Sequence, residues 1–155
     1  GASDHLVSEA VYARDADGNG IEVYADRPRD EWEETSVGVR IDTLSLDLGS
    51  LLADADPSGG VTATVGHVHL EVTDLDASEE FYHSLGFERR ARDERVRFLG
   101  AEGYHHHVAV NTWSSPNRRR PDGVEGIVGF GVEDADESED PDGIRVFDAS
   151  DQTVY

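Results

Sequence analysis

Two histidine-rich segments are the clearest sign of chemistry in this chain. The first reads Gly66-His-Val-His-Leu-Glu-Val72, and the second reads Tyr104-His-His-His-Val-Ala-Val-Asn-Thr-Trp113. Imidazole is the commonest metal ligand in proteins and the usual acid–base group near neutral pH. Two strands that each carry several imidazoles would form the wall of a metal site or of an acid–base site.

Strand geometry predicts which of these histidines lie together, because side chains two residues apart point to the same face of a strand. In the first segment His67 and His69 share a face. In the second segment His105 and His107 share a face, and His106 lies on the opposite one. The alternation therefore predicts that His105 or His107 faces the site and that His106 belongs to the core.

The residues between these segments predict the elements that position them. The strand at 66–72 is followed by a predicted helix over about 76–85, with Asp76 as its N-cap and Gly86 at its end. Apolar periodicity then predicts three more strands, at about 87–91, 95–100 and 105–112. This order of elements is a βαβββ module, so we expect the α+β fold class.

The N-terminal part predicts a hairpin and an excursion. Residues 6–13 and 21–25 read as two strands, and the segment 14–20 between them is rich in Asp, Asn and Gly, as turns are. Residues 27–60 read as a linker excursion with a short apolar stretch at 44–52 that is partly helical. The hairpin and the excursion therefore precede the module.

The C-terminal part predicts fewer elements than the module before it. Residues 126–132 and 143–148 read as two strands. The window 133–142 holds seven acidic residues in ten, and we expect it to be a solvated loop.

The net charge of the chain limits the classes of partner that it can bind. Asp and Glu number 34 against 13 Arg and no Lys, which gives a formal net charge of −21. So acidic a chain repels nucleic acid and anionic membranes, and we expect neither as a partner. Because the apolar periodicity argues against disorder, we interpret the charge as that of a halophilic protein, in which concentrated salt screens the self-repulsion.

Two absences bear on the compartment. The chain holds no Cys, which excludes disulfides and thiol chemistry. It shows no signal peptide and no run of about 18 apolar residues. We therefore expect a cytoplasmic protein.

Several strings resemble a known superfamily. Residues 66–75 and 80–88 resemble the opening of a module in the vicinal oxygen chelate superfamily, which includes glyoxalases, bleomycin-resistance proteins and extradiol dioxygenases. Residues 1–12, 17–28 and 103–113 are similar to the two-domain catechol-2,3-dioxygenase group of that superfamily. The resemblance covers most of residues 1–115.

The resemblance implies a fold and a metal. Paired βαβββ modules of this superfamily form a cup-shaped mixed sheet around one divalent metal, which in extradiol enzymes is usually Fe(II) held by two histidines and a glutamate. Open coordination positions then take a catecholate and O2. By this resemblance, the metal ligands of the chain are His67 and Glu22.

The resemblance also implies candidate catalytic residues. Tyr12 matches a substrate-side tyrosine on the strand before the ligand glutamate. His105 and His106 fall where extradiol enzymes carry an acid–base histidine, and because the run of three leaves the register open by one residue, His107 is a candidate too.

The departures from the family pattern suggest a truncated protein. We expect residues 1–26 to be the terminal hairpin of a truncated first domain, residues 27–60 a linker excursion, and residues 61–155 a second vicinal oxygen chelate domain with an abbreviated last module. In that last module, residues 126–130 carry no histidine, and Arg145 lies near the place of a ligand glutamate. We therefore expect an incomplete cup.

Three functions fit these residues. The first is a metal-dependent, ring-cleaving extradiol dioxygenase-like protein that acts on a small catechol-like aromatic substrate, with activity reduced by the truncation. The second is a non-catalytic small-molecule-binding module of the bleomycin-resistance type, and the third is a glyoxalase-type metal enzyme. Because an incomplete sheet leaves unpaired edge strands, we also expect a homodimer.

The acidic composition predicts that folding depends on salt. In dilute buffer the like charges repel over a long range and destabilise the compact state, whereas the Debye length falls to about 3 Å in 1 M salt. We expect circular dichroism to show a folded chain in molar salt and loss of structure in dilute buffer. Equal stability in the two solutions would contradict the halophilic interpretation.

Overall fold

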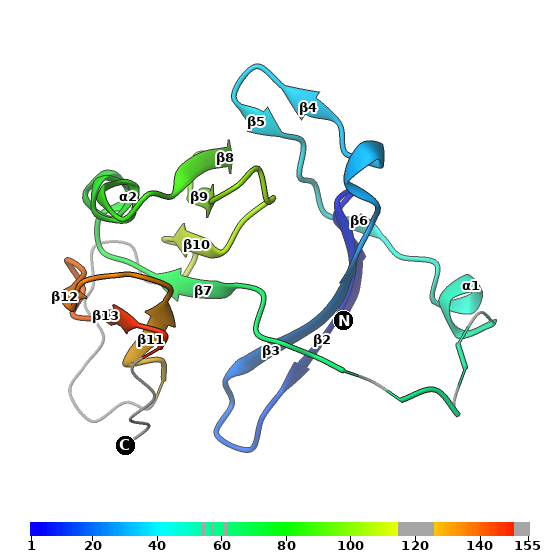
Figure 1. Cartoon of the computed structure of the whole chain (residues 1–155). Coiled ribbons are helices and arrows are strands. Elements are labelled where there is room, and N and C mark those ends of the chain that lie inside the picture. Colours follow the sequence, from blue (N-terminus) through cyan, green and yellow to red (C-terminus); the bar gives the residue numbers. More distant parts are fainter. Residues whose placement is uncertain (54, 57, 61, 115–125, 151–155) are drawn as a thin grey trace. The chain divides into compact units, whose positions relative to one another are not determined.

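A computed structural model describes residues 1–53, 55–56, 58–60, 62–114 and 126–150 of the chain. The chain divides into two compact units, residues 1–66 and residues 67–155 (Figure 1).

The first unit is built on an antiparallel sheet with the strand order β3-β2-β1-β6. Its strands are β1 (Ala2–Asp4), β2 (Ser8–Arg14), β3 (Gly20–Asp26) and β6 (Leu44–Ser45). Strands β2 and β3 form the predicted hairpin, in a register that pairs Tyr12 with Glu22.

The hairpin turn is closed by one carboxylate. Asp15 Oδ1 accepts hydrogen bonds from the backbone N–H groups of Asp17 at 3.0 Å and of Asn19 at 2.8 Å. Gly18 adopts φ +89°, a left-handed conformation that glycine tolerates without a steric penalty. The Asp, Asn and Gly residues of this segment therefore set the turn by local interactions, which is why the sequence predicts it well.

Short elements complete the first unit. They are the 3-10 helix η1 (Arg29–Glu31), the paired strands β4 (Glu34–Thr35) and β5 (Gly38–Val39), and the helix α1 (Leu48–Ala53). Strand β6 and all but the last residue of helix α1 fall in the stretch 44–52, which the sequence predicted to be partly helical. Trp32 is buried, and its indole N–H donates to the carbonyl of Arg27 at 3.0 Å.

The second unit contains the predicted βαβββ module. Its elements are β7 (Val68–Glu71), α2 (Leu75–Ser84), β8 (Glu88–Arg92), β9 (Val96–Gly100) and β10 (Val108–Asn111). They form a sheet in the order β7-β10-β9-β8, in which β7 and β10 are parallel and the other neighbours are antiparallel (Figure 1). The predicted α+β class is confirmed, and the described sheets are open rather than closed into a barrel.

The N-cap of helix α2 lies two residues before the predicted one. The N-cap is Asp74, whose carboxylate accepts from the backbone N–H groups of Asp76 and Ala77, both at 3.0 Å. The prediction of Asp76 as the cap was wrong, because Asp76 already has helical backbone and serves as a favourable acidic residue in the first turn. Gly86, with φ +94°, follows the end of the helix as predicted.

The two faces of the β7-β10-β9-β8 sheet differ in character. Leu70 pairs with Val110 across β7 and β10, and both side chains belong to the core cluster under α2, which packs against β8, β9 and β10. Ala109 pairs with His69 on one side and with Phe98 on the other, so these three side chains lie on the opposite face. The apolar face holds the helix, and the other face is left for polar and aromatic groups.

A third sheet follows the module. Its strands are β11 (Gly129–Val132), β12 (Ser138–Glu139) and β13 (Arg145–Asp148), in the order β11-β13-β12. The window 133–142 is therefore not wholly a solvated loop as predicted, because it contributes β12 and the buried Asp140. Val146 of β13 joins the core cluster of the module.

The buried carboxylate of Asp140 ties the third sheet to helix α2. Its Oδ2 accepts from the hydroxyl of Tyr82 at 2.9 Å, and its Oδ1 accepts from the backbone N–H groups of Asp142 at 2.9 Å and Ile144 at 2.8 Å. Burial, and then the negative charge of Asp140, raise the pKa of Tyr82 far above its usual value, so the hydroxyl stays protonated and donates. Three donors thus compensate the desolvation of one carboxylate.

No helix in the described part of the chain is both long enough and apolar enough to cross a membrane.

Tyr82→Phe should destabilise the second unit. The substitution keeps the ring but leaves a buried carboxylate oxygen without its side-chain donor, which costs about 1–3 kcal/mol in the free energy of unfolding. Denaturant unfolding in molar salt measures the change. The control is Ser84→Ala on the exposed side of the same helix, which we expect to stay within about 0.5 kcal/mol. Equal stability of the two variants would contradict a stabilising role for the Tyr82–Asp140 hydrogen bond.

Candidate metal centre

Three histidines of the second unit converge on one point. His67, His69 and His106 each offer a ring nitrogen, and these nitrogens all lie within 4.8 Å of one another. The Nε2 atoms of His69 and His106 are 3.3 Å apart, and the ring centroids of His67 and His106 are 4.2 Å apart. We call these three residues the histidine cluster.

Parallel pairing of β7 with β10 explains why the cluster forms. Parallel strands begin at the same edge of a sheet, and here Val68 and Val108 pair as the first residues of the two strands. The backbone N–H of Val68 donates to the carbonyl of His107 at 2.9 Å, which continues the ladder one residue beyond the strand. His67, one residue before β7, and His106, two residues before β10, therefore lie at the same edge, with their rings in contact.

His106 joins the cluster, whereas the alternation predicted His105 or His107. Strand β10 begins only at Val108, so the two-residue alternation does not extend back through the three histidines, and which of them acts at the site stays a prediction. Nδ1 of His107 instead accepts from the backbone N–H of Ala101 at 3.1 Å, and its ring contacts Phe87 of the core.

His105 lies behind His106 and is fully buried. Its Nδ1 is 2.6 Å from Nδ1 of His106, and its ring lies 4.1 Å from the ring of Tyr104 between centroids. A hydrogen bond between two ring nitrogens requires one donor and one acceptor, so the pair holds a proton between them. His105 therefore fixes the orientation of the His106 ring.

Burial and neighbouring imidazoles keep His106 neutral. Burial lowers the pKa of His106 well below its usual range, and charge repulsion from His67, and then from His105, lowers it further. The neutral imidazole is the form that binds a metal ion. The cluster thus holds an unprotonated nitrogen donor at neutral pH.

The first unit holds a separate polar cluster, composed of His5, Tyr12 and Glu22. The Tyr12 hydroxyl donates to Oε1 of Glu22 at 3.2 Å and is also hydrogen-bonded to Nε2 of His5. Nδ1 of His5 donates to the carbonyl of Asp42 at 2.7 Å. Burial, and then the charge and hydrogen bond of Glu22, raise the pKa of Tyr12 far above its usual value. The hydroxyl therefore stays protonated at neutral pH.

Comparison with known proteins identifies the family. Residues 64–138 match the glyoxalase/bleomycin resistance protein/dioxygenase superfamily. The chain carries a domain of this superfamily. The match spans the βαβββ module and its histidine cluster, and it confirms the resemblance seen in the sequence strings.

One relative in this superfamily covers much of the chain. Catechol-2,3-dioxygenase of Bacillus subtilis (strain 168) is 40% identical over 125 residues, which are 76% of this chain and 44% of that protein. The chain therefore spans less than half the length of this relative. No solved structure matches the chain significantly.

The histidine cluster of this vicinal oxygen chelate domain fits a divalent metal. With metal–nitrogen bonds of 2.0–2.1 Å, two ligands of a tetrahedral ion lie about 3.4 Å apart, close to the 3.3 Å between His69 and His106. Imidazole suits zinc, iron, copper and nickel alike, so the donor set is compatible with a divalent metal and does not select which one.

The predicted site residues fall into two groups. His67 and His106 lie together in the second unit, and Tyr12 and Glu22 lie together in the first. Shared ligation of one metal by His67 and Glu22 stays a prediction. His69 was not among the predicted site residues and joins the cluster. The strand face that it shares with His67 was the signal that could have found it.

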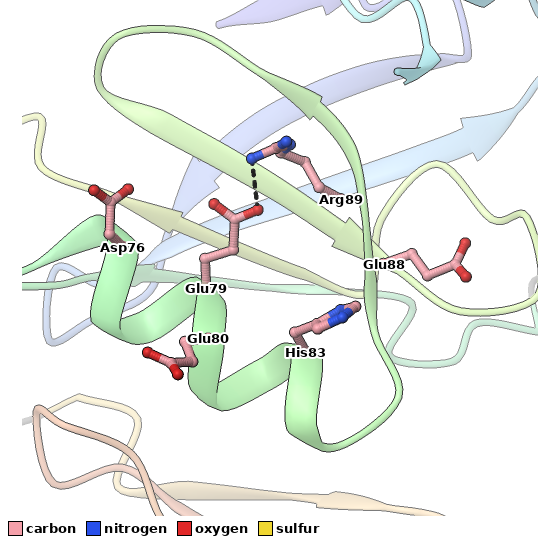
Figure 2. Close-up of a pocket in the computed structure, with 6 residues that line it drawn as sticks. All are labelled: Asp76, Glu79, Glu80, His83, Glu88 and Arg89. Carbon is pink, nitrogen blue, oxygen red and sulfur yellow. Dashed lines mark hydrogen bonds and ion pairs between the residues drawn. The ribbon is translucent and has the colours of Figure 1, made fainter. Parts of the chain in front are cut away.

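Another group of ionisable side chains lies away from the cluster. Figure 2 shows a hollow on α2 and β8 that is lined by Asp76, Glu79, Glu80, His83, Glu88 and Arg89. An ion pair of 2.9 Å joins Arg89 to Glu79, and Nδ1 of His83 donates to the carbonyl of Phe87 at 3.0 Å. These contacts connect the helix to the segment that leads into β8, so we interpret the hollow as helix–sheet packing.

His67→Ala and His106→Ala should each weaken metal binding strongly. Loss of a hydrogen-bond partner beyond the ligands typically costs 10–100-fold in metal affinity, so we expect loss of a ligand itself to cost at least about 100-fold. Calorimetric titration with Co(II) or Zn(II) measures the affinity. The matched control is His83→Ala, an exposed histidine outside the cluster, which should bind metal as the unaltered chain does. Full metal retention by the His67 variant would contradict the assignment.

Proposed function

We propose that this chain is a metal-dependent vicinal oxygen chelate protein of the ring-cleaving, extradiol dioxygenase type. The observation that carries the proposal is the convergence of His67, His69 and His106 at one edge of the module's sheet. The superfamily match and the similarity to a catechol-2,3-dioxygenase support the reaction class. The proposed substrate is a small catechol-like aromatic diol.

The proposed metal is Fe(II), by analogy with the ring-cleaving branch of the superfamily. A bound divalent metal would supply positive charge that stabilises the deprotonated diol and would orient it for reaction with O2. Two histidines and one carboxylate form the usual ligand set for such iron sites. In this proposal His67 is a ligand with a second imidazole of the cluster.

The chain's own residues would handle protons. His105 and His106 hold a proton between their Nδ1 atoms, which makes this pair the proposed acid–base group beside the metal. Tyr12, the proposed substrate-side tyrosine, keeps its proton at neutral pH and would exchange Glu22 for a substrate oxygen as its acceptor. His107, whose Nδ1 accepts from a backbone N–H, contributes by holding the segment in place rather than by proton transfer.

A non-catalytic binding module of the bleomycin-resistance type is the second candidate. The observation that favours it is the composition of the third sheet, where β11 and β13 supply no histidine and no glutamate to a site. A glyoxalase-type metal enzyme would share the histidine cluster but not ring cleavage. We propose a homodimer in each case, because the described sheets end in open edges that a second copy can cover.

Metal-dependent binding of catechol tests the proposal. We expect catechol to bind the metal-loaded chain at one site, and to bind neither the metal-free chain nor the His67→Ala variant, as measured by calorimetry in molar salt. Catechol affinity that is equal with and without metal would instead support the binding module.

Ring cleavage separates the two metal-dependent candidates. With Fe(II) and O2, a dioxygenase converts catechol to a coloured ring-opened product, and a glyoxalase-type enzyme does not. We expect slow product formation that follows metal occupancy and is lost in His106→Ala. Tight metal binding with no detectable ring cleavage at any metal occupancy would contradict the dioxygenase class.

A further inference from the structure

A half-exposed tryptophan lies beside the histidine cluster. Trp113 is 49% exposed, and its ring centroid is 6.1 Å from that of His69. The chain's other tryptophan, Trp32, is buried in the first unit. Single exposed apolar side chains are common, so exposure by itself indicates nothing. Trp113 differs from such side chains because it lies next to the cluster and because hydrogen bonds fix its backbone.

The backbone around Trp113 is fixed by three hydrogen bonds. Its N–H donates to the side-chain oxygen of Asn111 at 3.3 Å, and its carbonyl accepts from the Arg95 guanidinium. The next N–H, that of Ser114, donates to Oε1 of Glu71 at 3.1 Å. These contacts join the end of β10 to β7 and to the turn before β9.

The buried side chain of Asn111 connects the backbone of Trp113 to strand β7. Its side-chain amide donates to the carbonyl of Leu70 at 3.2 Å while its oxygen accepts from Trp113. A side chain that is rigid before binding loses little conformational entropy when a ligand packs on it. The backbone that carries the indole is therefore fixed beside the cluster, and the ring itself lies against His69.

A second aromatic ring lies against the same histidines. Phe98, on the same sheet face as His69, has its ring centroid 5.0 Å from that of His106 and 6.5 Å from that of His69. The nitrogen donors of the cluster thus stand among aromatic rings, one partly buried and one half-exposed. Flat aromatic molecules pack favourably on such surfaces, with ring centroids 4.5–7 Å apart.

We propose that Trp113 is the stacking platform for the planar ring of the ligand and selects aromatic diols over aliphatic oxygen chelators. The inference rests on the proposed metal site in the histidine cluster. A ligand whose oxygens reach that site would have its carbon skeleton close to the indole, since His69 contacts Trp113 directly. An aromatic ring gains stacking there, whereas a small aliphatic chelator does not.

The test compares an aromatic and a non-aromatic chelator on the Zn(II)-loaded chain. The probes are catechol and acetohydroxamate, both of which bind a metal through two oxygens, and the variants are Trp113→Leu and Trp113→Phe. We expect Trp113→Leu to lose about 10-fold in catechol affinity while its acetohydroxamate and zinc affinities stay unchanged. Trp113→Phe, which keeps a ring, should retain most of the catechol affinity.

Fluorescence gives an independent readout. Catechol should quench the emission of the zinc-loaded chain, and the quenching should vanish in Trp113→Phe, whose remaining tryptophan is the buried Trp32. Unchanged catechol affinity in Trp113→Leu, or equal losses for both chelators, would overturn the stacking role while leaving the metal site intact. Failure of the unaltered chain to bind zinc would overturn the proposed metal site, and the stacking role with it.

Discussion

The candidate site depends on the parallel pairing of β7 with β10. This pairing sets the N-terminal ends of two strands at one edge, although α2, β8 and β9 separate them in the sequence. A shift of the register by one residue would turn His69 from the open face of the sheet to the face covered by α2. The geometry of the cluster therefore follows from backbone hydrogen bonds, and the imidazoles need no attraction for one another to converge.

One face of that sheet packs in the core and stabilises the module, and the other face carries the site residues. Leu70, Val108 and Val110 bury their side chains beneath α2, and burial of apolar surface is the main force that holds the module together. The hydrogen bond between Tyr82 and Asp140 then attaches the third sheet to the same helix. Because these contacts lie on the face away from His69 and Phe98, the site residues can be polar or exposed without weakening the core.

The side chains of the histidine cluster differ in charge from the chain as a whole. The chain as a whole carries a formal net charge of −21, yet the histidine cluster contains no carboxylate among the groups that converge there. Burial, and then repulsion from the neighbouring imidazoles, lower the pKa of His106, so that this ring stays neutral and able to bind a metal. In the first unit, burial and the charge of Glu22 keep Tyr12 protonated by the same reasoning.

The sequence by itself determined the elements whose signals are local. The hairpin of β2 and β3 follows from Asp15, Asn19 and the glycines of its turn, and the βαβββ order follows from periodicity and from Gly86 at the end of α2. Even here the cap moved from Asp76 to Asp74, because either carboxylate satisfies the same local pattern.

Some residues of the site and of the core contact residues that are far away in the sequence. Only the tertiary structure decided which residues these are. Alternation along residues 105–107 did not predict that His106 joins the cluster, because the start of β10 is set by its neighbours β7 and β9 and not by its own residues. Asp140 belongs to an acidic run that looked solvated, and it is buried because Tyr82, 58 residues away, donates to it. Contacts between residues far apart in sequence leave no periodic trace, and strand pairing and long-range hydrogen bonds are contacts of this kind.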